Sequence, residues 1–249
     1  MLAIIGGSGL TVLSNMNVVR REIARTPYGE PSGPLTFGEL CGQNTVFLPR
    51  HGHGYTIPPH TVNYRANIWA LKEAGVTGII SVASVGGVRD GLVPGDIVIP
   101  HQIIDYTWGR ESTFFDGKDG VVRQVDFTEP YDSRLRQQII SAAIALGVDI
   151  KEGAVYAAIQ GPRLETAAEI VRYARDGADL VGMTGMPEAV LAREKNIPYA
   201  AINLVTNDAA GRCGSTDRIT QEGIQSVLHT RMEVVRAIIQ RMVGCPCSV

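Results

Sequence analysis

The chain has 249 residues, a formal net charge of −2 and 45% hydrophobic residues, which is typical of a globular protein. Because the charge is nearly balanced, no basic field recruits nucleic acid, and no apolar run approaches the roughly 20 residues of a membrane-spanning helix. The N-terminal apolar run lacks a basic segment and a cleavage site, so we expect a first strand rather than a signal peptide, and a cytoplasmic protein without membrane or nucleic-acid partners.

Four cysteines occur, at Cys41, Cys213, Cys245 and Cys247. None has the C-x2-C spacing or the clustered histidines of a zinc site, so we expect no metal. Two interpretations of the pair Cys245 and Cys247 stay open: a redox or disulfide role, and a frayed tail.

Strand and helix patterns alternate along the chain. Short apolar or β-branched runs predict strands, and apolar residues repeated along one face predict helices. In chain order we expect a strand at 2–5, a hairpin at 37–47 that turns at 41–44, a helix at 63–74, strands at 78–84 and 96–99, a helix at 133–146, a strand at 154–159, a helix at 166–175, a strand at 180–183, a helix at 187–195, a strand at 199–205 and a helix at 220–242. Residues 108–120 are polar and aromatic and predict a long excursion from the sheet. With no linker or repeat, the pattern predicts one α/β domain over residues 1–249, its sheet covered by helices on both faces.

A glycine-rich turn, Gly6-Gly7-Ser8-Gly9, follows the first strand. Successive backbone N–H groups and the Ser8 hydroxyl can hold an anion there. The turn lacks the spacing of a dinucleotide-binding or P-loop motif, so a tight turn without a ligand is an equal alternative.

A second motif, Arg50-His51-Gly52-His53-Gly54, follows the strand expected at 45–48. The planar fork of Arg50 suits phosphate oxygens, and His51 can add a donor. Anion binding is the first interpretation, ahead of a plain surface loop and of a metal site, for which a third ligand is lacking.

Other expected strands also end in glycine-rich or polar sequence, at residues 81–87, 160–165, 181–188 and 204–208. Taken singly, each has a plain structural explanation: Glu165 suits the first turn of a helix, and Asn207-Asp208 suits a turn. Their recurrence predicts a ligand site, because ligands of open α/β sheets bind beyond the carboxyl ends of strands.

Read together, several long segments resemble the trimeric purine nucleoside phosphorylase and methylthioadenosine phosphorylase family. They are IIGGSGL, RHGHGYTIPPHTVNYRANIWALKEAG, VPGDIVIPHQIIDYT, FFDG, QGPRLET and GMTGMPEAVLARE, in the same order and spacing. The resemblance covers residues 2 to about 208. It implies a mixed β-sheet, a homotrimer, and a pentosyltransferase of purine salvage that needs no cofactor and takes a nucleoside and phosphate as its small-molecule substrates.

The resemblance also implies roles for individual residues. Phosphate would be bound by Ser8, Arg50, His51, Ala83, Ser84 and Thr184. Nucleoside contacts would come from Leu164, Met183, Asn207, Asp208 and Ala209. Asn207 and Glu165 would be the catalytic residues, and Glu165, Ile219 and Ile224 would set specificity.

Donor and acceptor chemistry indicates the purine. An ionised Glu165 only accepts and suits the N1–H of a 6-oxopurine, while Asn207 can donate to O6 and accept from a protonated N7. Family members that act on methylthioadenosine carry Asp at the position of Asn207 and a small hydroxyl residue at that of Glu165. Whether Asn207 or Asp208 contacts N7 stays open.

The family's histidine for the 5′-hydroxyl is lacking in residues 219–227, where Ile219 and Ile224 can form an apolar slot instead. We therefore expect S-methyl-5′-thioinosine as the substrate, with inosine or guanosine second and S-methyl-5′-thioadenosine third. A non-catalytic nucleotide-binding module is the alternative of another class.

Overall fold

The computed structural model describes residues 1–117, 120, 122–212 and 219–244. Three of the cysteines lie outside these ranges: Cys213, Cys245 and Cys247. The two interpretations of the C-terminal cysteine pair therefore concern residues that the structure does not describe. The strands are β1 (Leu2–Gly6), β2 (Asn17–Glu22), β3 (Leu35–Leu40), β4 (Gln43–Pro49), β5 (Gly78–Gly87), β6 (Ile97–Asp105), β7 (Ile150–Ala158), β8 (Leu180–Gly182) and β9 (Tyr199–Asp208). The helices are α1 (Tyr64–Glu73), α2 (Ser133–Ala145), α3 (Ala167–Arg175), α4 (Gly185–Glu194) and α5 (Gln221–Met242), with a 3-10 turn at Pro59–Thr61.

Within the described ranges, one mixed sheet has the strand order β2-β3-β4-β1-β5-β8-β7-β6-β9. Strand β9 also pairs with β5, so strands β5, β8, β7, β6 and β9 close on themselves as a small barrel. Strands β1, β4, β5 and β9 run parallel, whereas β6, β7 and β8 run the opposite way. The predicted α/β class with a mixed sheet is confirmed.

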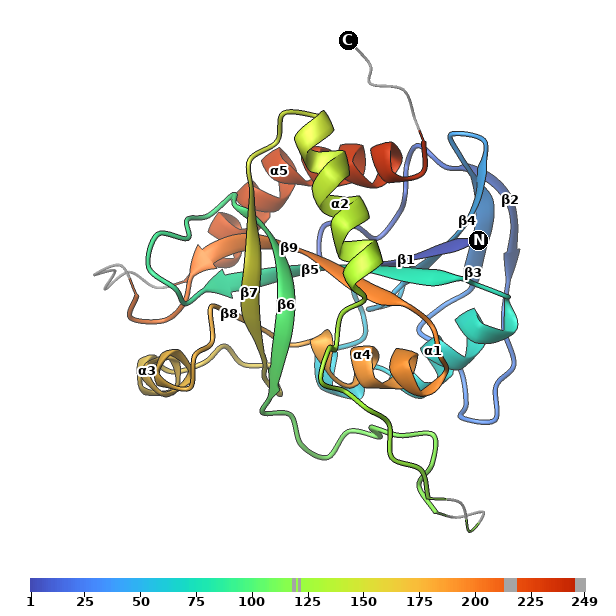
Figure 1. Cartoon of the computed structure of the whole chain (residues 1–249), viewed down its shortest axis with the longest axis horizontal. Helices are drawn as coiled ribbons and strands as arrows, with labels where there is room; N and C mark the ends of the chain where they lie inside the picture. Colours follow the sequence, from blue (N-terminus) through green and yellow to red (C-terminus); the bar gives the residue numbers. More distant parts are fainter. Residues whose placement is uncertain (118–119, 121, 213–218, 245–249) are drawn as a thin grey trace.

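Helices cover both faces of the sheet (Figure 1). Helices α2 and α5 pack on one side over a core that includes Ile80, Ile202 and Leu204, and α1 and α4 pack on the other side. Helix α3 covers a third, smaller apolar cluster beside β7 and β8. The strands are apolar on both faces, and α1, α2, α3 and α5 each bury one apolar stripe, whereas α4 is buried around most of its circumference.

Most expected elements are present, with small changes at their ends. The hairpin is confirmed: Cys41 and Gly42 form its two-residue turn with φ of 53° and 76°, the left-handed conformation that such turns require. Strand β2 was not predicted, because its six residues are all exposed and show no alternation between a buried and a polar face.

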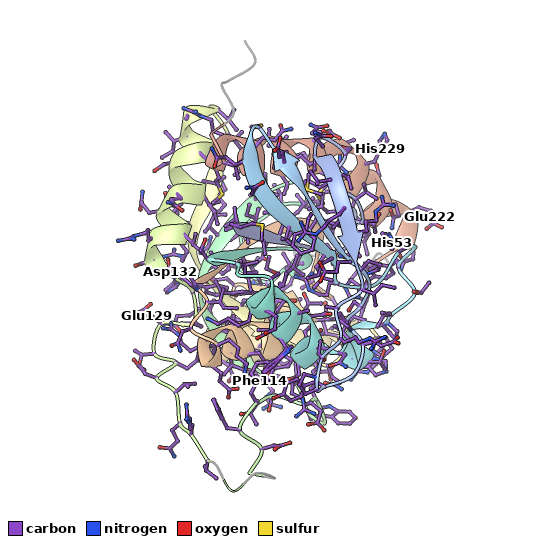
Figure 2. All side chains as sticks on the ribbon, turned by 90° about the vertical axis from the view of Figure 1, so that its right-hand side faces the viewer. His53, Phe114, Glu129, Asp132, Glu222 and His229 are labelled. Atoms are coloured by element: carbon purple, nitrogen blue, oxygen red, sulfur yellow. The ribbon has the colours of Figure 1, made fainter. Side chains whose placement is uncertain are left out.

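The predicted excursion is confirmed between β6 and α2. Figure 2 shows it extending below the body of the molecule, with Phe114 where it lies against the body and Glu129 where it returns towards Asp132 and α2. Phe114 packs against Trp69, the Lys195 ammonium lies 4.1 Å from the centre of the Phe114 ring, and Glu194 accepts hydrogen bonds from Thr113 Oγ1 and Phe114 N. These contacts fix the first part of the excursion next to the loops described below.

Candidate active site

The candidate site is built around the second half of β5. Strand β1, which leads into the glycine-rich turn, runs parallel to it on one side, and β9 runs parallel to it on another. Strand β8 runs antiparallel, with Gly86 opposite Val181, so Met183 and Thr184 continue back along β5 towards Ser84. The strand ends therefore converge from two directions, and not from the single edge that an open parallel sheet would provide.

The glycine turn lies directly against β5. A Cβ atom on Gly7 would stand 2.6 Å from the carbonyl oxygen of Val82 and 2.8 Å from Nη1 of Arg50, so no side chain fits at this position. The same point lies 3.6 Å from Cα of Ala83. The turn that carries Ser8, the Arg50 guanidinium and the Ala83 backbone are thus brought together.

Arg50 is completely buried and forms a two-pronged ion pair with Glu188 of α4. Nε lies 2.7 Å from Oε2 of Glu188, and Nη2 lies 2.9 Å from Oε1. Nη2 also donates to Ser81 Oγ at 2.6 Å, and Nη1 donates to the Val82 carbonyl at 2.9 Å. Burial acts to lower the pKa of Arg50, but the Glu188 carboxylate outweighs it and the pKa is raised. Partners among the described residues take four of the five guanidinium N–H groups and leave one N–H of Nη1.

His51 follows Arg50 and is 4% exposed. Its Nδ1 lies 2.8 Å from the carbonyl oxygen of Ile57, and since a carbonyl only accepts, the hydrogen is on Nδ1. Burial, together with the nearby charge of Arg50, lowers the pKa of His51 to about 4. At neutral pH the ring is then uncharged and its Nε2 can only accept a hydrogen bond, so this nitrogen offers an anion no donor, contrary to the expectation for His51.

Thr184 stands at the start of α4 and is 6% exposed. The backbone N–H groups of Thr184 and Gly185 donate to the Tyr156 hydroxyl at 3.2 and 3.4 Å. Met183 just before it is half-buried, and its Sδ lies 2.5 Å from where a Cβ on Gly161 would stand. Met183 therefore packs tightly against the loop that follows β7.

That loop, residues 160–165, is called the base loop below. Its Glu165 is 8% exposed and accepts hydrogen bonds from the backbone N–H groups of Glu165 and Ala210, while burial raises its pKa. Leu164 beside it is 41% exposed. The carboxylate consequently lies against the segment that follows β9.

The end of β9 carries the predicted amide. A register shift between Val85 and Gly86 places Asn207 opposite Gly86 and Asp208 opposite Gly87. Asn207 Nδ2 donates to the Asp208 carbonyl at 2.8 Å, Oδ1 accepts from Thr206 Oγ1 at 3.1 Å, and Ala209 N donates to the Gly87 carbonyl at 2.8 Å. One N–H of the amide is left for a ligand.

The two predicted isoleucines differ in their surroundings. Ile224 is partly buried against the α5 side of the core, one turn before Leu228, which lies 3.0 Å from where a Cβ on Gly9 would stand. The first turn of α5 thus adjoins the glycine turn. Ile219 is half-buried before the helix begins.

Three side chains around the site were not predicted. They are Glu188, Tyr156 and Arg110. Glu188 follows a proline and received no role from the sequence, but helix α4 is apolar around most of its circumference, which indicates a buried acid. Tyr156 and Arg110 carry no local signal, because their partners are backbone groups of distant segments.

The described residues contain neither a metal-binding cluster nor a membrane-spanning helix. No group of three His, Cys, Asp or Glu side chains is positioned there to hold a metal ion. Among the same residues, no helix is both long enough and apolar enough to cross a membrane.

Comparison with known proteins defines the class. Residues 1–243 match the Phosphorylase superfamily, so the chain belongs to this family, and the family resemblance is confirmed. A probable S-methyl-5′-thioinosine phosphorylase of Pseudomonas syringae pv. tomato is 48% identical over 97% of this chain and 98% of its own length. A 6-oxopurine nucleoside phosphorylase of Pyrococcus furiosus is 43% identical over 98% of this chain and 96% of its own. In structure, methylthioadenosine phosphorylase from Schistosoma mansoni in complex with adenine superposes with a TM-score of 0.92, at 34% identity, over 98% of this chain and 90% of that one.

Proposed function

We propose that this phosphorylase cleaves S-methyl-5′-thioinosine with phosphate, giving hypoxanthine and 5-methylthioribose 1-phosphate. The observation that carries the choice of a 6-oxopurine is the pairing of Glu165 with Asn207. The Glu165 carboxylate of the base loop accepts from the N–H of Ala210, three residues after Asn207, whose amide has one N–H without a partner among the described residues. This pair is complementary to N1–H and O6 of hypoxanthine, whereas an ionised carboxylate cannot pair with the bare N1 of adenine. The 48% identical relative named for methylthioinosine supports the same choice.

The proposed mechanism uses phosphate itself as the nucleophile. An oxygen of hydrogenphosphate forms a bond to C1′ as the bond from C1′ to N9 breaks, and the electron pair of that bond passes to the purine. The proton that hydrogenphosphate loses on becoming the sugar phosphate dianion ends on N7 of the leaving purine, by way of solvent. Ser8, Arg50 Nη1, the Ala83–Ser84 backbone and Thr184 would hold phosphate, and Met183 and Leu164 would pack on the nucleoside. The neutral Nε2 of His51 would accept a hydrogen bond, which suits an O–H of phosphate. Such positioned groups lower the barrier by stabilising opposite charges on sugar and base.

The methylthio preference depends on the first turn of α5. Ile224, with Ile219 before it, would offer apolar surface to a 5′-methylthio group, worth about 1–2 kcal/mol by transfer from water. A 5′-hydroxyl in the same place would lose water without gaining a partner. Of the two purine contacts left open, we propose Asn207 for N7, with Asp208 and Ala209 shaping the wall beside it.

One assay tests the proposal. Methylthioinosine, inosine, methylthioadenosine and adenosine are each incubated with and without phosphate, and release of free base is measured. We expect base release only with phosphate, with catalytic efficiency highest for methylthioinosine, then inosine, then methylthioadenosine. Best cleavage of methylthioadenosine would refute the base assignment and favour Asp208 as the base contact. Inosine equal to methylthioinosine would refute only the 5′ pocket and leave a general 6-oxopurine phosphorylase. Binding without cleavage would favour a non-catalytic module.

The remaining expectations are part of the same proposal. We propose one phosphorylase domain over residues 1–249, a homotrimer, a cytoplasmic location, and phosphate as co-substrate with no cofactor. An exposed Trp108 at the rim of the base loop, 71% accessible, supports a surface covered by a second subunit. Light scattering on the purified protein tests the trimer, and a monomeric mass would refute it.

A further inference from the structure

Arg110 lies in the excursion between β6 and α2, and its guanidinium group is enclosed by backbone carbonyls. Nη1 donates to the carbonyl oxygens of Met183 at 2.8 Å and Met186 at 2.6 Å. Nη2 donates to those of Ile159 at 3.1 Å and Gln160 at 2.7 Å. Nε donates to the side-chain oxygen of Gln160 at 3.2 Å. All five N–H groups of the guanidinium are thereby directed at acceptors from two segments.

These two segments are the ones that the proposed function uses on either side of the nucleoside. Residues Ile159 and Gln160 lead into the base loop with Leu164 and Glu165. Residues 183–186 contain Met183 and Thr184, which would contact sugar and phosphate. The two segments begin where the pairing of β7 with β8 ends, at Ala158 opposite Gly182. Their carbonyl groups therefore lack strand partners, and Arg110 supplies the donors instead.

The contact between the two segments is tight. A Cβ atom added to Gly161 would stand only 2.5 Å from Met183 Sδ, so no side chain fits between the two segments. A small displacement of either segment therefore moves the other. Arg110 is also 3.3 Å from the Tyr64 hydroxyl, which fixes the guanidinium against α1. The same corner contains a main-chain hydrogen bond from Ile159 N to the Gly182 carbonyl, and the Tyr156 hydroxyl accepts from the N–H groups of Thr184 and Gly185.

We propose that Arg110 is a positioning residue for the phosphorolysis. It holds the base loop and the Met183–Thr184 segment at the separation at which the purine and the phosphate are aligned on C1′. The inference rests on the proposed function, and it makes the excursion part of the catalytic apparatus although none of its residues need touch the substrate. Lysine cannot replace arginine in this role, because a single ammonium cannot reach four carbonyls in one plane.

The test compares Arg110→Lys and Arg110→Ala with the wild type. Arg136→Lys is the matched control, since Arg136 also donates to a backbone carbonyl, that of Pro100 at 2.7 Å, but from α2. We expect Arg110→Lys to lower kcat about 100-fold per folded molecule, because a misplacement of about 1 Å costs that much. Arg136→Lys should keep the wild-type kcat and KM. Methylguanidine at millimolar concentration should restore part of the activity of Arg110→Ala, and methylammonium should not.

A second readout does not depend on activity. Hydrogen exchange should speed up in Arg110→Lys within residues 159–165 and 183–186 together, while Arg136→Lys leaves both segments protected as in the wild type. The proposal is overturned if Arg110→Lys keeps the wild-type kcat and KM, or if neither segment exchanges faster. It is also overturned if lost activity only follows the lost folded fraction. A wild-type protein that cleaves no nucleoside would refute the proposed function, and unchanged exchange would then separately refute the positioning role.

Discussion

Replacing Arg50 by alanine should damage the fold as well as phosphate use. Arg50 and Glu188 are both completely buried, and the pair is joined at 2.7 and 2.9 Å. Without Arg50, the Glu188 carboxylate keeps only the Tyr199 hydroxyl, at 2.8 Å, among the partners seen here. Breaking a buried ion pair costs about 3–5 kcal/mol because one charge is left without compensation. The loss of activity in this variant must therefore be measured per folded molecule.

The magnitude can be checked by thermal unfolding. For a chain of this size each kcal/mol shifts Tm by about 2–4 °C, so Arg50→Ala should melt roughly 6–20 °C below the wild type. The double variant Arg50→Met, Glu188→Leu removes both charges and should regain most of the lost stability. Its phosphate-dependent activity should nevertheless stay low, since the Nη1 donor is missing.

This design separates stability from ligand binding. Circular dichroism melts and phosphate titrations of base release are measured on the wild type, on Arg50→Ala and on the double variant. If Arg50→Ala melts with the wild type, the buried pair contributes little. If the double variant recovers both its Tm and its phosphate KM, Arg50 has a structural role only and the phosphate assignment is wrong.

Four further predictions concern the pH dependence of stability, the pH dependence of the rate, base selectivity and metal. The pKa of His51 is depressed to about 4, so its neutral form contributes about 3 kcal/mol to the free energy of unfolding above pH 6.5, and this contribution is lost as the pH falls through 4. In urea titrations, the free energy of unfolding of His51→Gln should depend less steeply on pH than that of the wild type. An unchanged slope would contradict this. Because burial raises the pKa of Glu165, activity on methylthioinosine should rise with pH through that raised value, and pH–rate profiles should lose this limb in Glu165→Gln. Asn207→Asp should lower activity on methylthioinosine. The double variant with Glu165→Ser should move the substrate preference towards methylthioadenosine in competition assays. An unchanged preference would count against the proposed base contacts. Incubation with a chelator should leave the rate unchanged, and a loss restored by a divalent ion would show a missed metal site.

Elements and candidate residues could be predicted from sequence wherever the signal is local. Four of the predicted helices begin at a residue whose side chain accepts a hydrogen bond from an N–H three residues further on: Asn63, Asp132, Thr166 and Thr220. Such caps can be predicted because both partners lie close together in the sequence. Strand direction was not accessible: nothing local to residues 180–183 shows that β8 runs against β5. The buried partners of Arg50 were missed for the same reason, since Glu188 lies 138 residues further along the chain.

The pairing of Arg50 with Glu188 also bears on how phosphate would be held. A lone buried guanidinium would give a dianion a strong net attraction, and would hold substrate phosphate and product sugar phosphate equally. Here Glu188 cancels the charge, so the proposed ligand meets a directed N–H of Nη1 beside the hydroxyl of Ser8 and the acceptor Nε2 of His51. Directed groups of this kind favour one geometry of the anion over another, whereas a net charge does not. Selectivity for the arrangement in which phosphate attacks C1′ would therefore come from orientation. Rate should then fall more steeply on displacing these groups than on adding salt.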